Sequence, residues 1–256
     1  MSETTGPKPV TGVSSSMWLQ IGDFVFAAIR LNLAAVIACL PLVAILVLAI
    51  EPVRAFPTLI VAAWLSSPGL AACFAAFRDA PGFSAGPGCH EDLSGSTAGA
   101  ARFWASGDVS IARPFARAYR RLFARSLSVS ALPAGLALLL AVDAAWLAST
   151  DTLHALVPAM IVAISICMLD WVIGLVFVTE LAMGSWWQIV KAAAVCAVRK
   201  WYLSIVTLVV LALLAAGVVH SPLPVLAIAA SLALYLVWAN CRWSALPVLR
   251  ATIERR

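Results

Sequence analysis

Residues 201–219 read WYLSIVTLVVLALLAAGVV, and after His220-Ser221 the apolar sequence continues over 222–241 as PLPVLAIAASLALYLVWANC. Neither stretch holds a charged side chain. Each is long enough to cross about 30 Å of hydrocarbon as a helix that rises about 1.5 Å per residue. Pro222 and Pro224 argue against one long helix through both stretches. The sequence therefore predicts two membrane-spanning helices joined by a very short turn.

Four further apolar runs of similar length precede this hairpin, at 24–50, 55–77, 126–149 and 152–179. Hydrophobic residues make up 63% of the 256-residue chain and charged residues 11%, whereas soluble domains carry about 25% charged residues. A soluble fold could not cover so much apolar surface. We therefore expect an all-α polytopic membrane protein with about six transmembrane helices, in one membrane domain (18–256) that follows a disordered cytoplasmic tail (1–17).

The second apolar run contains Pro57 and the pair Pro68-Gly69, which are expected to kink it. It leads into a cytoplasmic loop over 79–107 that is rich in Gly, Ala, Ser and Pro and is expected to be flexible.

Lysine and arginine are distributed very unevenly between the two sides of the predicted membrane. If the N-terminus is inside, 16 of the 17 lysines and arginines lie on or near the cytoplasmic side, and Arg54 alone falls in a predicted outer loop. Basic residues favour cytoplasmic loops, so both termini are predicted to be cytoplasmic. The net charge is +5, and the basic residues lie beside apolar spans. Anionic lipid headgroups are therefore favoured over nucleic acid as the partner of these residues. The outer turns are too short to hold a solute-binding domain.

The segment 109–125 reads VSIARPFARAYRRLFAR. At about 100° per residue, one side of a helix gathers Ile111, Phe115, Ala118, Tyr119 and Leu122. The opposite side gathers Arg113, Arg117, Arg120, Arg121 and Arg125. This pattern predicts an in-plane amphipathic helix on the cytoplasmic side, with its apolar face in the acyl boundary and its arginines on headgroup phosphates. A cytoplasmic helix packed on the protein is the alternative.

The segment 185–200 shows a weaker version of the same pattern and predicts a second surface helix. Its apolar residues are Trp186, Trp187, Ile189 and Val190, and its basic residues are Lys191, Arg199 and Lys200. Six tryptophans near predicted membrane boundaries indicate an aromatic belt at the lipid–water interface: Trp146, Trp186, Trp187, Trp201, Trp238 and Trp243.

Charged residues within apolar runs are costly and are candidates for function. Asp170 and Arg30 lie at similar predicted depths, about 8 Å and 9 Å from the inner membrane boundary. We predict that they form an ion pair between the first and fourth spans. In the alternative, Arg30 reaches the headgroups, while Asp170 stays protonated or faces a wet cavity. Asp143 and Glu180 lie near the ends of their spans, where hydration would suffice.

The chain contains no Walker A, GxGxxG or HExxH motif, and no GxSxG motif with a usable histidine partner. Cys89-His90-Glu91-Asp92 places four potential metal ligands in a row, but adjacent residues seldom converge on one ion, and we interpret them as part of a solvated loop. The six cysteines show no CxxC pair and are expected to be reduced. We expect a protein that is not an enzyme and has no cofactor.

Three stretches resemble the YesL-like family of small bacterial membrane proteins: Leu31-Asn32-Leu33 leading to Leu40-Pro41, SSPGLAACFAAFRD at 66–79 and ARPFARAYRRLFARSL at 112–127. The resemblance implies a protein of the bacterial plasma membrane with no established chemistry. Members of this family are often encoded beside sugar ABC importers. The resemblance therefore implies an accessory or regulatory role in carbohydrate import, with such an importer as partner. A small transporter or channel is the alternative, favoured by the kinked second span and the intramembrane acids.

Overall fold

The computed structural model describes residues 29–48, 55–79, 112–150, 154–181 and 185–253. Within these ranges all regular structure is helical, which confirms the predicted all-α class. The elements in chain order are the helix Ile29–Ala38, α2 (Leu40–Leu48), α3 (Phe56–Leu65), α4 (Ser67–Asp79), α6 (Ala112–Ala148), η1 (His154–Leu156), α7 (Val157–Glu180), α8 (Trp186–Arg199), α9 (Trp201–His220), α10 (Pro222–Pro224), η2 (Val225–Ala229) and α11 (Ala230–Ile253).

Among the described residues, four helices are long and apolar enough to cross a membrane: most of α6, α7, α9 and the η2–α11 helix. The number rises to six if each of two bent helix pairs is one span. The protein is therefore a helical, multi-pass membrane protein.

Both bent pairs occur in the first two predicted spans. Ile29–Ala38 meets α2 at 83°, with Cys39 between them, and α3 meets α4 at 49°, with Ser66 between them. The second bend confirms the predicted kink, because Pro68 lies in the first turn of α4, where a missing N–H costs no helical hydrogen bond. The first bend corrects the single helix expected over 24–50. Pro41 accounts for it, because it has no N–H to donate back to the preceding helix.

α6 unites two elements that were predicted to be separate. The surface helix predicted over 109–125 and the span predicted over 126–149 form one helix of 37 residues, Ala112–Ala148, so the predicted boundary at Arg125 is not a break. Across this boundary Ser126 Oγ donates to the carbonyl of Phe123, within the helix. A helix of this length is about 55 Å long, so it extends well beyond about 30 Å of hydrocarbon.

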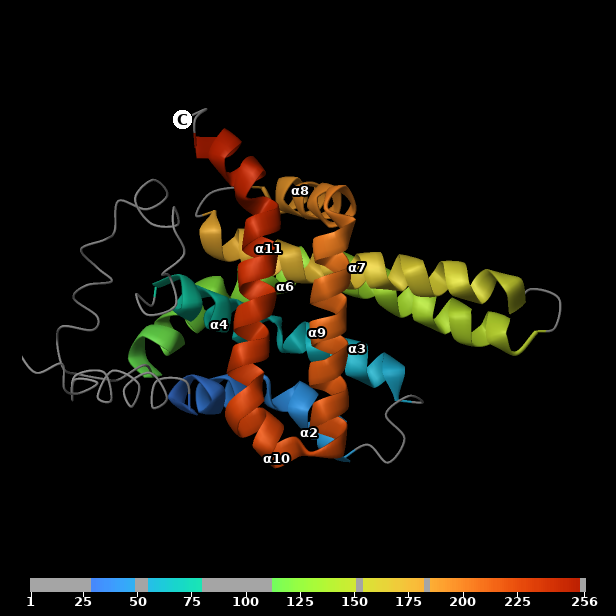
Figure 1. Cartoon of the computed structure of the whole chain (residues 1–256), viewed down its shortest axis with the longest axis horizontal. Helices are drawn as coiled ribbons and strands as arrows, with labels where there is room; N and C mark the ends of the chain where they lie inside the picture. The colour runs from blue at the N-terminus through green and yellow to red at the C-terminus, as the bar shows by residue number, and fades with distance from the viewer. Residues whose placement is uncertain (1–28, 49–54, 80–111, 151–153, 182–184, 254–256) are drawn as a thin grey trace, which may run out of the picture.

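Two antiparallel helix pairs dominate Figure 1, and they cross each other: α6 with α7, and α9 with α11. The helix ends predicted to be cytoplasmic lie at the left and top of the view, where α4, α7 and α11 end, α6 begins and α8 lies. The ends predicted to be external lie at the right and bottom, where α3 and α7 begin and α9 ends. The helices therefore alternate in direction between two sides of the molecule. We call the first of these sides the inner side.

We predict that both hairpin tips are external. Cysteine replacing Ser149, at the tip of the α6–α7 hairpin, or Ser221, between α9 and α10, should react with a membrane-impermeant maleimide in intact cells. Cysteine replacing Arg256 should react only after lysis. All replacements are made in a chain with Cys89→Ser, and this chain alone is the control, because the described cysteines are buried or half-buried. Labelling at one tip but not at the other in intact cells would contradict the assignment of both hairpins as spans.

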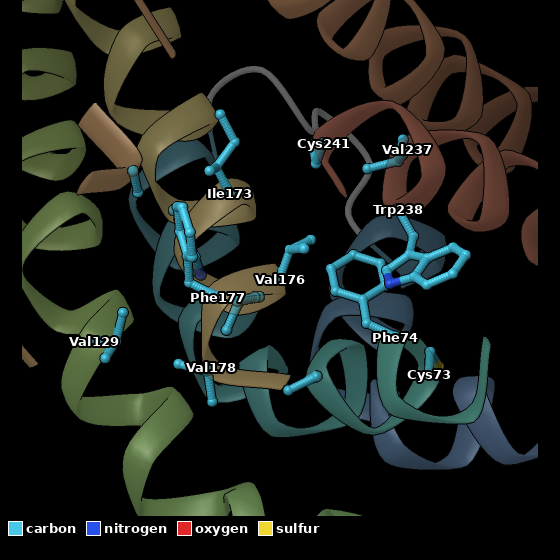
Figure 2. Close-up of a cluster of buried hydrophobic side chains, with 14 of the residues drawn as sticks. Cys73, Phe74, Val129, Ile173, Val176, Phe177, Val178, Val237, Trp238 and Cys241 are labelled. Carbon is cyan, nitrogen blue, oxygen red and sulfur yellow. The ribbon is translucent and has the colours of Figure 1, made fainter. Parts of the chain in front are cut away.

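The hydrophobic core lies where α4, α7 and α11 meet. Figure 2 shows Phe74 of α4, Phe177 of α7 and Trp238 of α11 in this cluster, with Val129 of α6 at its edge. α4 is buried along most of its length and contributes several small residues, which let neighbouring helices approach closely: Ala71, Ala72, Cys73 and Ala75. The second half of the second span is thus the centre of the fold.

Candidate functional site

The bends of the first two spans pack directly on each other. Cys39 Sγ lies 3.8 Å from the carbonyl oxygen of Ser66, so the two bends touch. A Cβ on Gly69 would lie 2.9 Å from Ala38 Cβ and 2.9 Å from Cys39 Sγ. Only glycine lets α4 come this close to the backbone of the first bend. We call this contact, formed by Cys39, Ser66, Ser67 and Gly69, the bend junction.

Polar groups surround the bend junction inside the protein. Ser66 and Ser67 are fully buried, and Ser67 Oγ accepts a hydrogen bond of 3.0 Å from Trp171 Nε1 of α7. Ser66 Oγ has no hydrogen-bond partner within the described part of the chain. Irregular backbone at membrane depth is tolerated where protein or a water-filled cavity covers it, and here protein covers it. Interrupted helices of this kind form ion and substrate sites in several transporter folds.

Asp170 precedes Trp171 on α7 and is half-buried. Its Oδ1 atom is buried and has no hydrogen-bond partner among the residues that the structure describes. A buried carboxyl oxygen of this kind can hold a proton or accept a hydrogen bond from a ligand.

The ion pair between Arg30 and Asp170 stays a prediction. Arg30 is exposed on Ile29–Ala38, whereas Asp170 is half-buried on α7. The prediction assumed a straight first span, whereas this span bends by 83°. The first span turns Asn32 inward, and the Nδ2 of Asn32 donates to the carbonyl of Ala227 in η2 at 2.6 Å.

A second polar cluster ties together the inner ends of α4, α7 and α11. Glu180, at the end of α7, pairs with Arg242 of α11 at 3.2 Å between Oε1 and Nε, and their side chains are 7% and 6% exposed. Arg78 of α4 donates to the carbonyl of Thr179. We call Arg78, Thr179, Glu180 and Arg242 the inner-end network. It corrects the expectation that Glu180 is simply hydrated.

The inner-end network rests on an aromatic cluster. The Arg242 guanidinium lies 5.3 Å from the ring centroid of Trp238, and Phe77 and Tyr235 pack beside that indole. Trp238 is 3% exposed, so it belongs to the core and not to the predicted aromatic belt. The other five predicted belt tryptophans are exposed, as an interfacial position requires. The sequence signal for the network was present: Glu180 and Arg242 both end spans at the same predicted depth.

The arginine-bearing part of α6 has its apolar face against the protein. Phe115 and Leu122 are buried in the core. For this face the structure therefore agrees with the alternative prediction, a helix packed on the protein. Ile111 lies outside the described residues. Arg113, Arg117, Arg120 and Arg121 are exposed, and Arg125 is half-buried. We call the four exposed arginines the arginine face. Their contact with lipid headgroups stays a prediction.

Residues 80–107 of the predicted flexible loop, with Cys89-His90-Glu91-Asp92, lie outside the described residues. Within the described ranges, no group of three or more His, Cys, Asp or Glu residues could hold a metal ion. No known family model, curated protein or solved structure matches this chain. The resemblance to the YesL-like family therefore stays an expectation, and what is established is a helical, multi-pass integral membrane protein.

Proposed function

We propose that this membrane protein is a non-enzymatic accessory or regulatory component of the bacterial plasma membrane that acts in carbohydrate import. The observation that carries the accessory role is the arginine face. Four guanidinium groups lie on one exposed side of α6, while the opposite side is held in the core, so the charges are presented on a fixed surface. The link to carbohydrate rests on the family resemblance alone.

The arginine face suits an anionic partner on the cytoplasmic side. α6 extends beyond the hydrocarbon, so guanidinium groups near its N-terminal end can reach lipid phosphates or the acidic surface of a membrane-bound importer subunit. Arginine binds phosphate and carboxylate groups with two parallel hydrogen bonds, which gives such a contact geometry as well as charge.

We expect a subunit of a sugar ABC importer to copurify with this protein from a mild detergent when the tagged chain is expressed at its native level. Changing Arg113, Arg117, Arg120 and Arg121 together to Glu should reduce recovery at least tenfold, because each attraction becomes a repulsion. The matched control replaces the same four residues with Lys, which keeps the charge. Failure to recover any importer subunit with the unaltered chain would contradict the proposal.

A second candidate is a small transporter or channel, favoured by the bend junction and Asp170. Two interrupted helices meet in the protein interior, and a buried carboxyl oxygen lies on the helix that contacts them. Both features are common at coupling-ion sites.

If the second candidate is right, the purified protein should move protons or sugars across proteoliposome membranes. An entrapped pH-sensitive dye and a panel of radiolabelled mono- and disaccharides would detect this flux. Asp170→Asn should lower the flux at least tenfold, because the amide cannot release a proton. Asp143→Asn, at an exposed position of α6, is the control and should leave the flux unchanged. Absence of any flux with the unaltered chain would exclude the transporter reading for these solutes.

A further inference from the structure

α8 has a buried apolar face and, opposite to it, further apolar side chains that are exposed. One face is buried against the protein and consists of Ile189, Val190, Ala193, Cys196 and Ala197. The other face exposes Trp187, Val195 and Val198, with the two valines 59% and 61% exposed. The sequence pattern grouped Trp186 and Trp187 with Ile189 and Val190, but the helix turns the tryptophans outward and the aliphatic pair inward. Gln188 and Lys191 are also exposed on this outer side. The outer side therefore needs an environment that accepts apolar and charged side chains together, as the boundary between lipid headgroups and acyl chains does.

The exposed apolar surface continues from α8 onto the neighbouring helices. Trp201 and Tyr202 at the start of α9, and Trp243 on α11, are exposed. Farther along α9, the exposed residues are aliphatic: Ile205, Val206, Val209 and Leu213. This change from aromatic to aliphatic side chains along one helix is expected where the headgroup layer gives way to hydrocarbon.

Three cations accompany the exposed aromatic side chains. Lys191 Nζ lies 4.9 Å from the ring centroid of Trp187, and Lys200 Nζ donates to the carbonyl of Trp243 at 3.0 Å. Arg199 is exposed at the end of α8. The chain contains no Asp or Glu from Leu181 to Ile253, so these helices supply no carboxylate to neutralise the cations.

We propose that α8 lies flat in the boundary between headgroups and acyl chains of the inner leaflet, and that Lys191, Arg199 and Lys200 bind the phosphates of anionic lipids there. Lipid fits both properties of the surface, because acyl chains cover Trp187, Val195 and Val198 while phosphates meet the cations. A second copy of this chain fits less well, since two such faces would bring like charges together. The inference concerns lipid and holds whether the protein is an accessory component or a transporter.

The depth of α8 can be measured with spin labels on the full-length chain in vesicles of phosphatidylcholine and phosphatidylglycerol. Cys89→Ser and Cys167→Ser lower the background labelling. Burial raises the pKa of the Cys196 thiol, which slows its reaction with the label. A spin label on cysteine replacing Val195 should be more accessible to oxygen than to a water-soluble nickel complex. Its ratio of the two accessibilities should lie between that of a reference label at Leu213, within the α9 span, and that of a reference label at Ser221, at the hairpin tip. Nickel access equal to that at Ser221 would overturn the proposal. So would exclusion of both reagents, which would indicate that protein covers this face.

The choice of anionic lipid can be tested by thermal unfolding in nanodiscs. Replacing phosphatidylcholine with phosphatidylglycerol should raise the Tm of the unaltered chain. Lys191→Gln with Arg199→Gln should reduce this gain by half or more, whereas Lys191→Arg with Arg199→Lys should preserve it. Inorganic phosphate added to phosphatidylcholine nanodiscs should give no gain, which separates a lipid phosphate from a free one. An equal gain in the glutamine variant, or a full gain from inorganic phosphate, would overturn the binding of anionic lipid at α8.

Discussion

Gly69→Ala is expected to lower the free energy of unfolding by about 1–3 kcal/mol, the usual range for overpacking a close-packed interior. The added methyl group would lie 2.9 Å from Cys39 Sγ and 3.0 Å from the carbonyl carbon of Ala38. A backbone atom cannot move aside as the end of a side chain can. The two bends must therefore separate, and the hydrogen bond of Trp171 to Ser67 is expected to weaken with them. Gly69→Val should cost more than Gly69→Ala, because it adds two further methyl groups at the same contact.

Gly135→Ala is the matched control for this prediction. Gly135 also lies inside a helix, but a Cβ placed on it would meet nothing within 4 Å. Alanine there should be neutral or stabilise the protein by up to about 1 kcal/mol, because it is the better helix former. Unfolding in mixed micelles with increasing dodecyl sulfate measures both variants. Equal stability of Gly69→Ala and Gly135→Ala would show that the bend junction does not form.

The sequence predicted the helical elements well because lipid imposes a strong length and polarity requirement on each of them. The α9 span was expected over 201–219 and is Trp201–His220. The second bend could be predicted from Pro68-Gly69. The first bend could not, because the expectation weighed the apolar length of 24–50 and gave no weight to Pro41. Hydropathy measures length and does not show how straight a helix is.

The partners of polar side chains were predicted less well than the spans. The sequence offers only the depth of a charged residue along its span as a guide to its partner. On this basis Arg30 was predicted to pair with Asp170, because the two residues lie at similar distances from the inner boundary. Depth gives no information on which helices are neighbours or which side of a helix faces the core. Glu180 and Arg242 satisfied the same depth criterion, and the structure pairs them. The α6 helix shows the same limit, since its amphipathic pattern was correct but its apolar face packs on protein and not on lipid.

The second large effect on stability is expected from the ion pair between Glu180 and Arg242 in the inner-end network. Glu180→Gln or Arg242→Met alone is expected to destabilise the protein by about 3–5 kcal/mol, because each leaves one buried charge without its counter-charge. Arg242→Met also removes the contact of the guanidinium with the Trp238 ring, so it should destabilise the protein more than Glu180→Gln does. Replacing both, with Glu180→Gln and Arg242→Met together, should cost less than the sum of the single changes, because neither charge is then stranded.

A double-mutant cycle on these four chains, unfolded in the same mixed micelles, would measure the coupling between Glu180 and Arg242 directly. Asp79→Asn is the control for a change of charge near the same helix ends. Asp79 pairs with Arg78 at 2.7 Å, but its side chain is 63% exposed, so this change should cost no more than about 1 kcal/mol. A coupling energy near zero would mean that Glu180 and Arg242 do not hold the ends of α7 and α11 together. A large coupling would identify their pair as the contact that fixes how the two crossed hairpins meet, because Glu180 ends a helix of one hairpin and Arg242 lies on a helix of the other.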